Sequence, residues 1–137
     1  MNKLDIDRIN AEIENVEKVI SVIEKYSNRE DLSELELAGL ATYIHNFYNG
    51  VENIIKQILK SKSVTFKDSP SWHRDLLLSA SENNIISEEF YEVLLKFLSF
   101  RHFFVHSYSF ILDYKELKSL IDFMPDIWNS FKSQIDL

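Results

Sequence analysis

The segment "RHFFVHSYSF", residues 101–110, places four side chains with charged or titratable groups inside one of the most apolar stretches of the chain. An imidazole has an unperturbed pKa near ~6.5, so His102 and His106 can accept or donate protons near neutral pH. The guanidinium of Arg101 stays charged and can bind an oxyanion in bidentate fashion. With the phenol of Tyr108, these groups could bind an anion and move protons beside it.

Helix geometry divides these residues between two faces. The apolar residues upstream recur in steps of three and four, and Arg101 and Tyr108 continue their stripe. The histidines lie on a separate polar stripe, and His106 is well over a right angle away from Arg101 around an ideal helix. A guanidinium on an apolar stripe is costly without a partner. It could reach the surface, pair with Glu52, or lie at an interface between two subunits whose polar edge lines a cleft.

Each residue also has a purely structural interpretation. His102 and His106 can be solvated, and Tyr108 can pack its ring with the hydroxyl at the rim. Two histidines at i and i+4 could bind one metal ion. However, no H-E-x-x-H pattern surrounds them, and Asp113, the nearest carboxylate on their stripe, is two turns away. We therefore expect no metal at these histidines, and we also expect no cofactor.

A second polar stripe lies about fifty residues earlier. His45, Asn49, Glu52 and Lys56 follow one another in steps of four, three and four, on the side of a predicted helix away from its apolar residues. Alone, this pattern indicates an ordinary solvent-exposed face. If it faces the polar stripe of the later helix, it adds hydrogen-bonding groups to a shared groove.

Helical periodicity is the main structural signal. Apolar residues recur at helical spacing in five stretches, at residues 6–23, 40–58, 72–76, 90–108 and 117–135. Glycine and proline occur only twice each, which favours long helices, and no alternating strand pattern is long enough to support a sheet. The sequence predicts one all-α domain over its 137 residues, an antiparallel bundle of about five helices.

Capping residues predict where the later helices begin. Ser69, followed by a proline, is expected to cap the third helix, and Ser87 to cap the fourth. Asp113 and Glu116 resemble a capping box for the last helix. Pro125 should bend that helix, and because the apolar spacing continues across it we expect one bent helix.

Composition narrows the function. The net charge of -7 and the pI near 5.1 argue against a broad electrostatic grip on nucleic acid, so any such contact must be local. The chain contains no cysteine, the N-terminus lacks the apolar run of a signal peptide, and no stretch approaches the ~20 apolar residues that span a bilayer. We expect a cytoplasmic protein that does not enter the membrane.

The reactive segment also resembles a known family. Residues 101–106 fit the R-x4-H motif of the HEPN superfamily, and Tyr108 extends it to the R-x4-H-x-Y form of HepT-type toxins. Together with "YIHNFYNGVENIIKQI" (43–58) and "SWHRDLL" (71–77), the segment is similar to the HepT-like ribonuclease family over residues 43–114. The five-helix prediction agrees with the HEPN fold.

The resemblance implies a homodimeric, metal-independent endoribonuclease whose two motifs face one cleft. Arg101 would bind the phosphoryl oxygens and His106 would act as base or acid, which leaves a 2′,3′-cyclic phosphate and a 5′-hydroxyl. His102, Asn49 and Glu52 would support them. His102 stands where many members of the family have asparagine, so its orienting role is a departure from the family pattern.

The resemblance also implies a partner. The protein would be the toxin of a type VII-like HEPN/MNT toxin–antitoxin system, neutralised when an MNT-type nucleotidyltransferase antitoxin adenylylates Tyr108. The added phosphate would lie beside Arg101 and fill the RNA site. RNA would bind only in the cleft, where His73 and Arg74 add positive charge to that of the motif. The alternatives are a non-catalytic HEPN domain that binds nucleotide or phosphate for a partner nucleotidyltransferase, and a purely structural helical dimer.

Overall fold

The computed structural model describes residues 1–65, 69–106 and 114–136, with only the backbone of His106. Within these ranges the chain forms six helices and no strand, so the all-α prediction is confirmed. The helices are α1 (Lys3–Tyr26), α2 (Glu34–Ser61), α3 (Trp72–Glu82), α4 (Glu88–His106), α5 (Tyr114–Ile121) and α6 (Met124–Ile135). None of them is both long and apolar enough to cross a bilayer.

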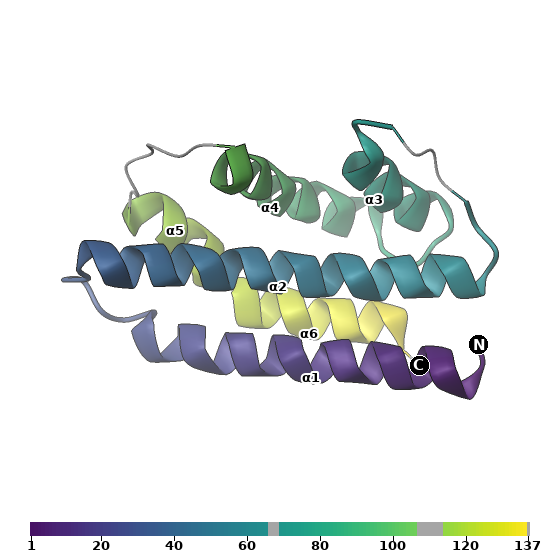
Figure 1. Cartoon of the computed structure of the whole chain (residues 1–137), viewed down its shortest axis with the longest axis horizontal. Helices are drawn as coiled ribbons and strands as arrows, with labels where there is room; N and C mark the ends of the chain where they lie inside the picture. The colour runs from purple at the N-terminus through teal and green to yellow at the C-terminus, as the bar shows by residue number, and fades with distance from the viewer. Residues whose placement is uncertain (66–68, 107–113, 137) are drawn as a thin grey trace.

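The long helix α2 is the centre of the bundle. It runs through the middle of the structure, with α1 and α6 on one side and α3 and α4 on the other (Figure 1). Every apolar residue that the spacing placed on its core face is buried; these are Leu40, Ile44, Phe47, Val51, Ile54 and Ile58. Helices packed on opposite sides bury further residues, including Tyr48 and Leu59, which widens the stripe around α2.

Helix α1 comes close to the backbone of α2 at Gly50. A Cβ atom at this position would lie 2.3 Å from Cγ2 of Val16, far inside van der Waals contact. The missing side chain therefore lets the two longest helices of the described chain pack closely at this point.

Local capping sets the start of several helices. Ser87 caps α4 as predicted, because its hydroxyl accepts a hydrogen bond from the backbone N–H of Phe90 at 3.1 Å. The predicted cap at Ser69 is wrong, since α3 begins only at Trp72. The hydroxyls of Ser69 and Ser71 instead donate to Asp75 in the first turn, at 3.1 and 3.5 Å. The predicted capping box at Asp113 lies outside the described residues.

The predicted single bent helix at the C-terminal end is wrong. The structure contains two helices there, and α5 ends at Ile121, four residues before Pro125. A proline lacks a backbone N–H and its ring clashes with the carbonyl of the residue four positions earlier, so the helix stops at that residue. Both helices still bury apolar residues in the same core, including Leu117 and Phe131. This shared core explains why the apolar spacing continues across the break.

Candidate functional site

A cationic groove lies between the start of α3 and the second half of α4. It has a volume of about 680 Å³. Its polar lining comes from Ser71, His73 and Arg74 on one side and from Ser99, Arg101 and His102 on the other. None of the described residues that line it is acidic, although the chain has a net charge of -7. The groove is therefore a place where this acidic protein can bind an anion.

Arg101 lines this groove with its guanidinium partly buried. Its Nε is buried and has no hydrogen-bond partner among the described residues. The suggested pairing with Glu52 is not what the structure shows, because no ion pair joins the two within the described ranges. A guanidinium that lines a groove and makes no ion pair with the described residues can bind an anionic ligand.

Glu52 pairs with a histidine of α3 instead. Its carboxylate lies 2.8 Å from Nδ1 of His73, and the residue is only 5% exposed. The ring of His73 stacks on Trp72, with a centroid distance of 3.5 Å, and Nζ of Lys56 lies 5.3 Å from the centroid of Trp72. Glu52 is thus no part of a solvent-exposed face, and it reaches the groove through His73.

The other two polar residues of the α2 stripe contact each other. Nδ2 of Asn49 donates to Nε2 of His45 at 3.0 Å, and the ring of His45 packs against Phe104 of α4 with centroids 5.0 Å apart. Neither residue is among those that line the groove. The side-chain amide of Asn49 therefore donates to His45, which packs on α4, and Asn49 itself does not reach the groove.

A group of titratable and charged side chains interacts where α2 packs on α4. Its members are Arg101, His45, Tyr48 and Glu52. Burial lowers the pKa of His45, the positive charge of Arg101 lowers it further, and Glu52 opposes the change. Burial also raises the pKa of Tyr48 well above its ordinary value, and the Glu52 carboxylate adds to this increase while Arg101 opposes it. Tyr48 therefore stays a neutral phenol, and His45 favours its neutral form.

The remaining motif residues can be placed only in part. The backbone of α4 stays helical to His106, so the five-residue spacing from Arg101 keeps the two positions on different faces. Tyr108, the predicted modification site, lies outside the described residues. His102 is exposed and lines the groove beside Arg101. Across the described ranges, no group of three or more histidine, aspartate or glutamate side chains could hold a metal ion.

His73 is the residue whose place the sequence did not predict. The sequence predicts His73 only as a source of positive charge in the RNA cleft, whereas the structure shows that it bonds to the buried carboxylate of Glu52. The two residues are 21 positions apart and belong to different helices. Spacing within one helix carries no signal for such a contact, because only tertiary packing creates it.

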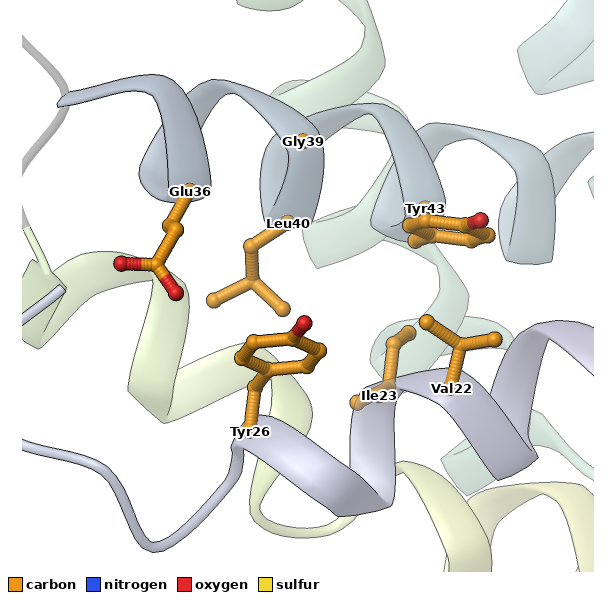
Figure 2. Close-up of a pocket in the computed structure, with 7 residues that line it drawn as sticks. All are labelled: Val22, Ile23, Tyr26, Glu36, Gly39, Leu40 and Tyr43. Atoms are coloured by element: carbon orange, nitrogen blue, oxygen red, sulfur yellow. The ribbon is translucent and has the colours of Figure 1, made fainter. Parts of the chain in front are cut away.

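A second hollow offers a contrast. It lies between the end of α1 and the start of α2 and has a volume of about 200 Å³. Figure 2 shows its lining, which is largely aliphatic and aromatic, with the Glu36 carboxylate at one end and Tyr43 at the other. The carboxylate forms an ion pair with Arg29 at 3.2 Å. This hollow lacks the group of cationic residues that distinguishes the groove between α3 and α4.

Comparison with known families finds a match that covers the residues of the groove. A family model described as "HepT-like protein" matches residues 39–137, a range that contains α3, α4 and the whole groove. The fold is similar to that of YutE from Bacillus subtilis, a cytosolic protein of unknown function, with a TM-score of 0.77 and 18% sequence identity over 96% of this chain and 87% of that one. No individually curated protein sequence matches the chain.

Proposed function

We propose that this chain, which belongs to the HepT-like family, is a metal-independent endoribonuclease and the toxin of a HEPN/MNT-type toxin–antitoxin pair. One observation carries the proposal. The only arginine of the R-x4-H motif lines a cationic groove, and its buried Nε has no partner among the described residues. Because Arg101 lines the groove, its guanidinium can bind an oxyanion of RNA there.

The chemistry needs one charged group and two proton transfers. Arg101 binds the non-bridging oxygens of the scissile phosphate and stabilises the negative charge that grows on them. The 2′-hydroxyl loses its proton, its oxygen bonds to phosphorus, and the bond from phosphorus to the 5′-oxygen breaks. The 5′-oxygen takes up a proton. His106 serves one of these transfers, and the products are a 2′,3′-cyclic phosphate and a 5′-hydroxyl.

The proposal includes a homodimer in which Arg101 of one subunit meets His106 of the other. The two positions lie on different faces of one helix, so the side chains of a single subunit do not face the same site. A second copy of the chain can bring its His106 to the Arg101 of the first. Phe103 is 45% exposed and Val105 is 39% exposed near the motif end of α4. Such an apolar surface suits burial against another subunit.

Regulation by adenylylation of Tyr108 and a cytoplasmic location belong to the same proposal. An AMP group on Tyr108 would add a negatively charged phosphate near the motif in sequence, and we propose that it competes with RNA for the cationic groove. A cytoplasmic location is supported by the absence of cysteine and by the similar fold of YutE, which is described as cytosolic.

A second function is favoured by the net charge of -7, which repels extended RNA outside the groove. The protein would then be a non-catalytic HEPN domain that binds nucleotide or phosphate at Arg101 for a partner nucleotidyltransferase. In that case His106 could be replaced without loss of binding.

The test uses purified full-length protein, single-stranded RNA and EDTA. We expect the wild-type protein to cleave and His106→Ala to lose cleavage by about 10²-fold or more. Lys96→Ala, which changes an exposed residue of the same helix outside the groove, is the control and should cleave normally. Full cleavage by His106→Ala would reject the catalytic assignment, and binding of AMP without any RNA product would support the second function.

A mixing experiment tests the shared site. Arg101→Met and His106→Ala are each inactive as homodimers, but a mixed dimer holds one site with both residues intact. After the two variants exchange subunits, about a quarter of the wild-type activity should return, because half of the dimers are mixed and each has one working site. No recovery from a mixture shown to contain mixed dimers would contradict a site shared between subunits.

A further inference from the structure

The pair formed by Glu52 and His73 has no role in the proposed reaction, although His73 lines the same groove as Arg101. Glu52 is the only charged residue that is buried in the described part of the chain. A buried carboxylate is costly unless a strong hydrogen bond satisfies it, and His73 provides that bond at 2.8 Å. An apolar residue would fill the position with no such cost, so the pair calls for an explanation.

The geometry fixes which nitrogen of His73 is available. A carboxylate can only accept a hydrogen bond, so Nδ1 of the ring donates to Glu52 and carries the proton. In the neutral ring Nε2 then holds a lone pair. Nε2 lies on the edge of the ring away from Nδ1, and it makes no hydrogen bond to any described residue. Stacking of Trp72 on the face of the ring holds this orientation.

We infer that His73 is a catalytic general base for RNA cleavage, oriented by Glu52 and acting in the same groove as Arg101. The inference rests on the proposed ribonuclease function. Nε2 of His73 takes the proton from the 2′-hydroxyl while the 2′-oxygen bonds to phosphorus and the bond to the 5′-oxygen breaks. His106 gives a proton to the departing 5′-oxygen. Solvent then removes the proton from His73 and restores the one on His106, so the step balances.

The arrangement of a carboxylate behind an imidazole has a clear chemical use. The carboxylate selects the tautomer that can accept a proton, and its negative charge stabilises the imidazolium that forms. The charged and titratable groups around His73 come from three helices: Glu52 and Lys56 of α2, Arg74 and Asp75 of α3, and Arg101 and His102 of α4. The carboxylate of Asp75 accepts from two serine hydroxyls, which leaves Glu52 as the acidic partner of the ring.

The main test replaces His73 with asparagine. His73→Asn keeps a donor for Glu52 but cannot accept a proton, so kcat should fall by about 10²-fold or more while KM changes by less than about threefold. The rise of kcat with pH on the acid side should disappear. Glu52→Gln keeps an acceptor without its charge, so kcat should fall less and the rise should persist. Glu17→Gln, the same change in an exposed ion pair with Lys132, should leave kcat unaltered.

A modified substrate separates the base from the acid. When the 5′-oxygen of the scissile bond is replaced by sulfur, the leaving group departs without needing a proton. This substrate should restore cleavage in His106→Ala and leave His73→Asn slow. Restored cleavage in His73→Asn would overturn the inference, and so would an unchanged kcat or an unchanged acid limb in that variant. In those cases the ribonuclease proposal stands, because the wild-type protein still cleaves.

Two further outcomes are decisive. If the wild-type protein cleaves no RNA, both the proposed function and this inference fail. If His73→Asn does not fold, ¹⁵N NMR of the wild-type protein takes its place, with a substrate analogue that keeps the 2′-hydroxyl but has a methylene group instead of the 5′-oxygen, so that it cannot be cleaved. The proton should then be found on Nδ1 of His73, and the Nε2 resonance should shift when the analogue binds. A proton on Nε2, or no shift on binding, would overturn the inference.

Discussion

The two halves of α4 use the same helical stripe for opposite purposes. In the first half, Phe90, Leu94 and Phe97 are no more than 5% exposed and belong to the core. One turn later, the stripe continues with Arg101, whose Nε is buried without a partner among the described residues. The packed first half anchors the helix, and this anchoring keeps the costly guanidinium of the second half at the groove.

The core half is secured at several points. Ser87 caps its first turn, and the backbone N–H of Ser87 donates to the side chain of Gln134 at 2.7 Å. The ring of Phe97 meets Phe47 of α2 edge to face, with centroids 5.4 Å apart. Arg101 follows Phe97 by one turn, so the position of the guanidinium depends on this packing.

The largest expected effect comes from the core half. Phe97→Ala removes a ring that is 2% exposed, and such a change costs about 3–5 kcal/mol of unfolding free energy. Urea unfolding of the full chain, followed by circular dichroism, measures the loss. A cost below about 1 kcal/mol would show that Phe97 is not a main anchor of α4 and that the first half of the helix does not fix the position of Arg101.

The next effect should appear in cleavage and leave stability unharmed. Arg101→Met keeps the length and the packing of the side chain but removes its charge, so cleavage should fall by about 10²–10³-fold. The free energy of unfolding should stay equal or rise, because a poorly paired buried N–H disappears. Cleavage assays and urea unfolding are run on the same samples. Lys96→Met, on the exposed face of the same helix, is the control.

A marked loss of stability in Arg101→Met would instead show that the guanidinium belongs to the core. The division of α4 into a structural half and a functional half would then be wrong.

The same division explains what the sequence could predict. The core faces of α2 and α4 follow from periodicity alone, since burial repeats every three or four residues wherever one face meets the core. The cap at Ser87 is a local feature and was also predictable. The prediction of one bent helix at Pro125 is wrong because it relied on the apolar spacing, which continues from α5 into α6. The spacing reports which side faces the core and does not require an unbroken backbone.

The site was less accessible to sequence reasoning, for a physical reason. The motif drew attention to Arg101, and the structure places that residue and His102 in one groove. The spacing along α2 places Glu52 on a polar stripe, but its burial and its bond to His73 arise where α3 packs on α2. Contacts between helices depend on tertiary geometry, which the spacing along one helix does not encode. The roles of His106 and Tyr108 stay predictions.

The smallest expected effect concerns His45 of α2, which packs against Phe104 in the second half of α4. Its pKa is lowered by burial and by Arg101, and its ring packs on Phe104. Nδ1 is buried with no partner in the described chain, and Nε2 already accepts from Asn49. A second ring proton would point at the donating amide of Asn49, so the folded protein resists protonation.

The sign of the pH effect follows from this resistance. His45 titrates near its ordinary value of 6.5 in the unfolded chain and lower in the folded protein. At a pH between these two pKa values, the unfolded chain binds more protons than the folded protein. The contribution of His45 to stability is therefore complete above its ordinary pKa of 6.5 and is lost as the pH falls toward the lower pKa of the folded protein. Urea unfolding from about pH 7.5 to about pH 5 should show that wild type loses more stability than His45→Phe, which has no titrating ring. Arg101→Met should show an intermediate loss, because removing the neighbouring charge makes His45 easier to protonate. Equal losses in wild type and Arg101→Met would mean that the functional half of α4 does not act on His45 through its charge.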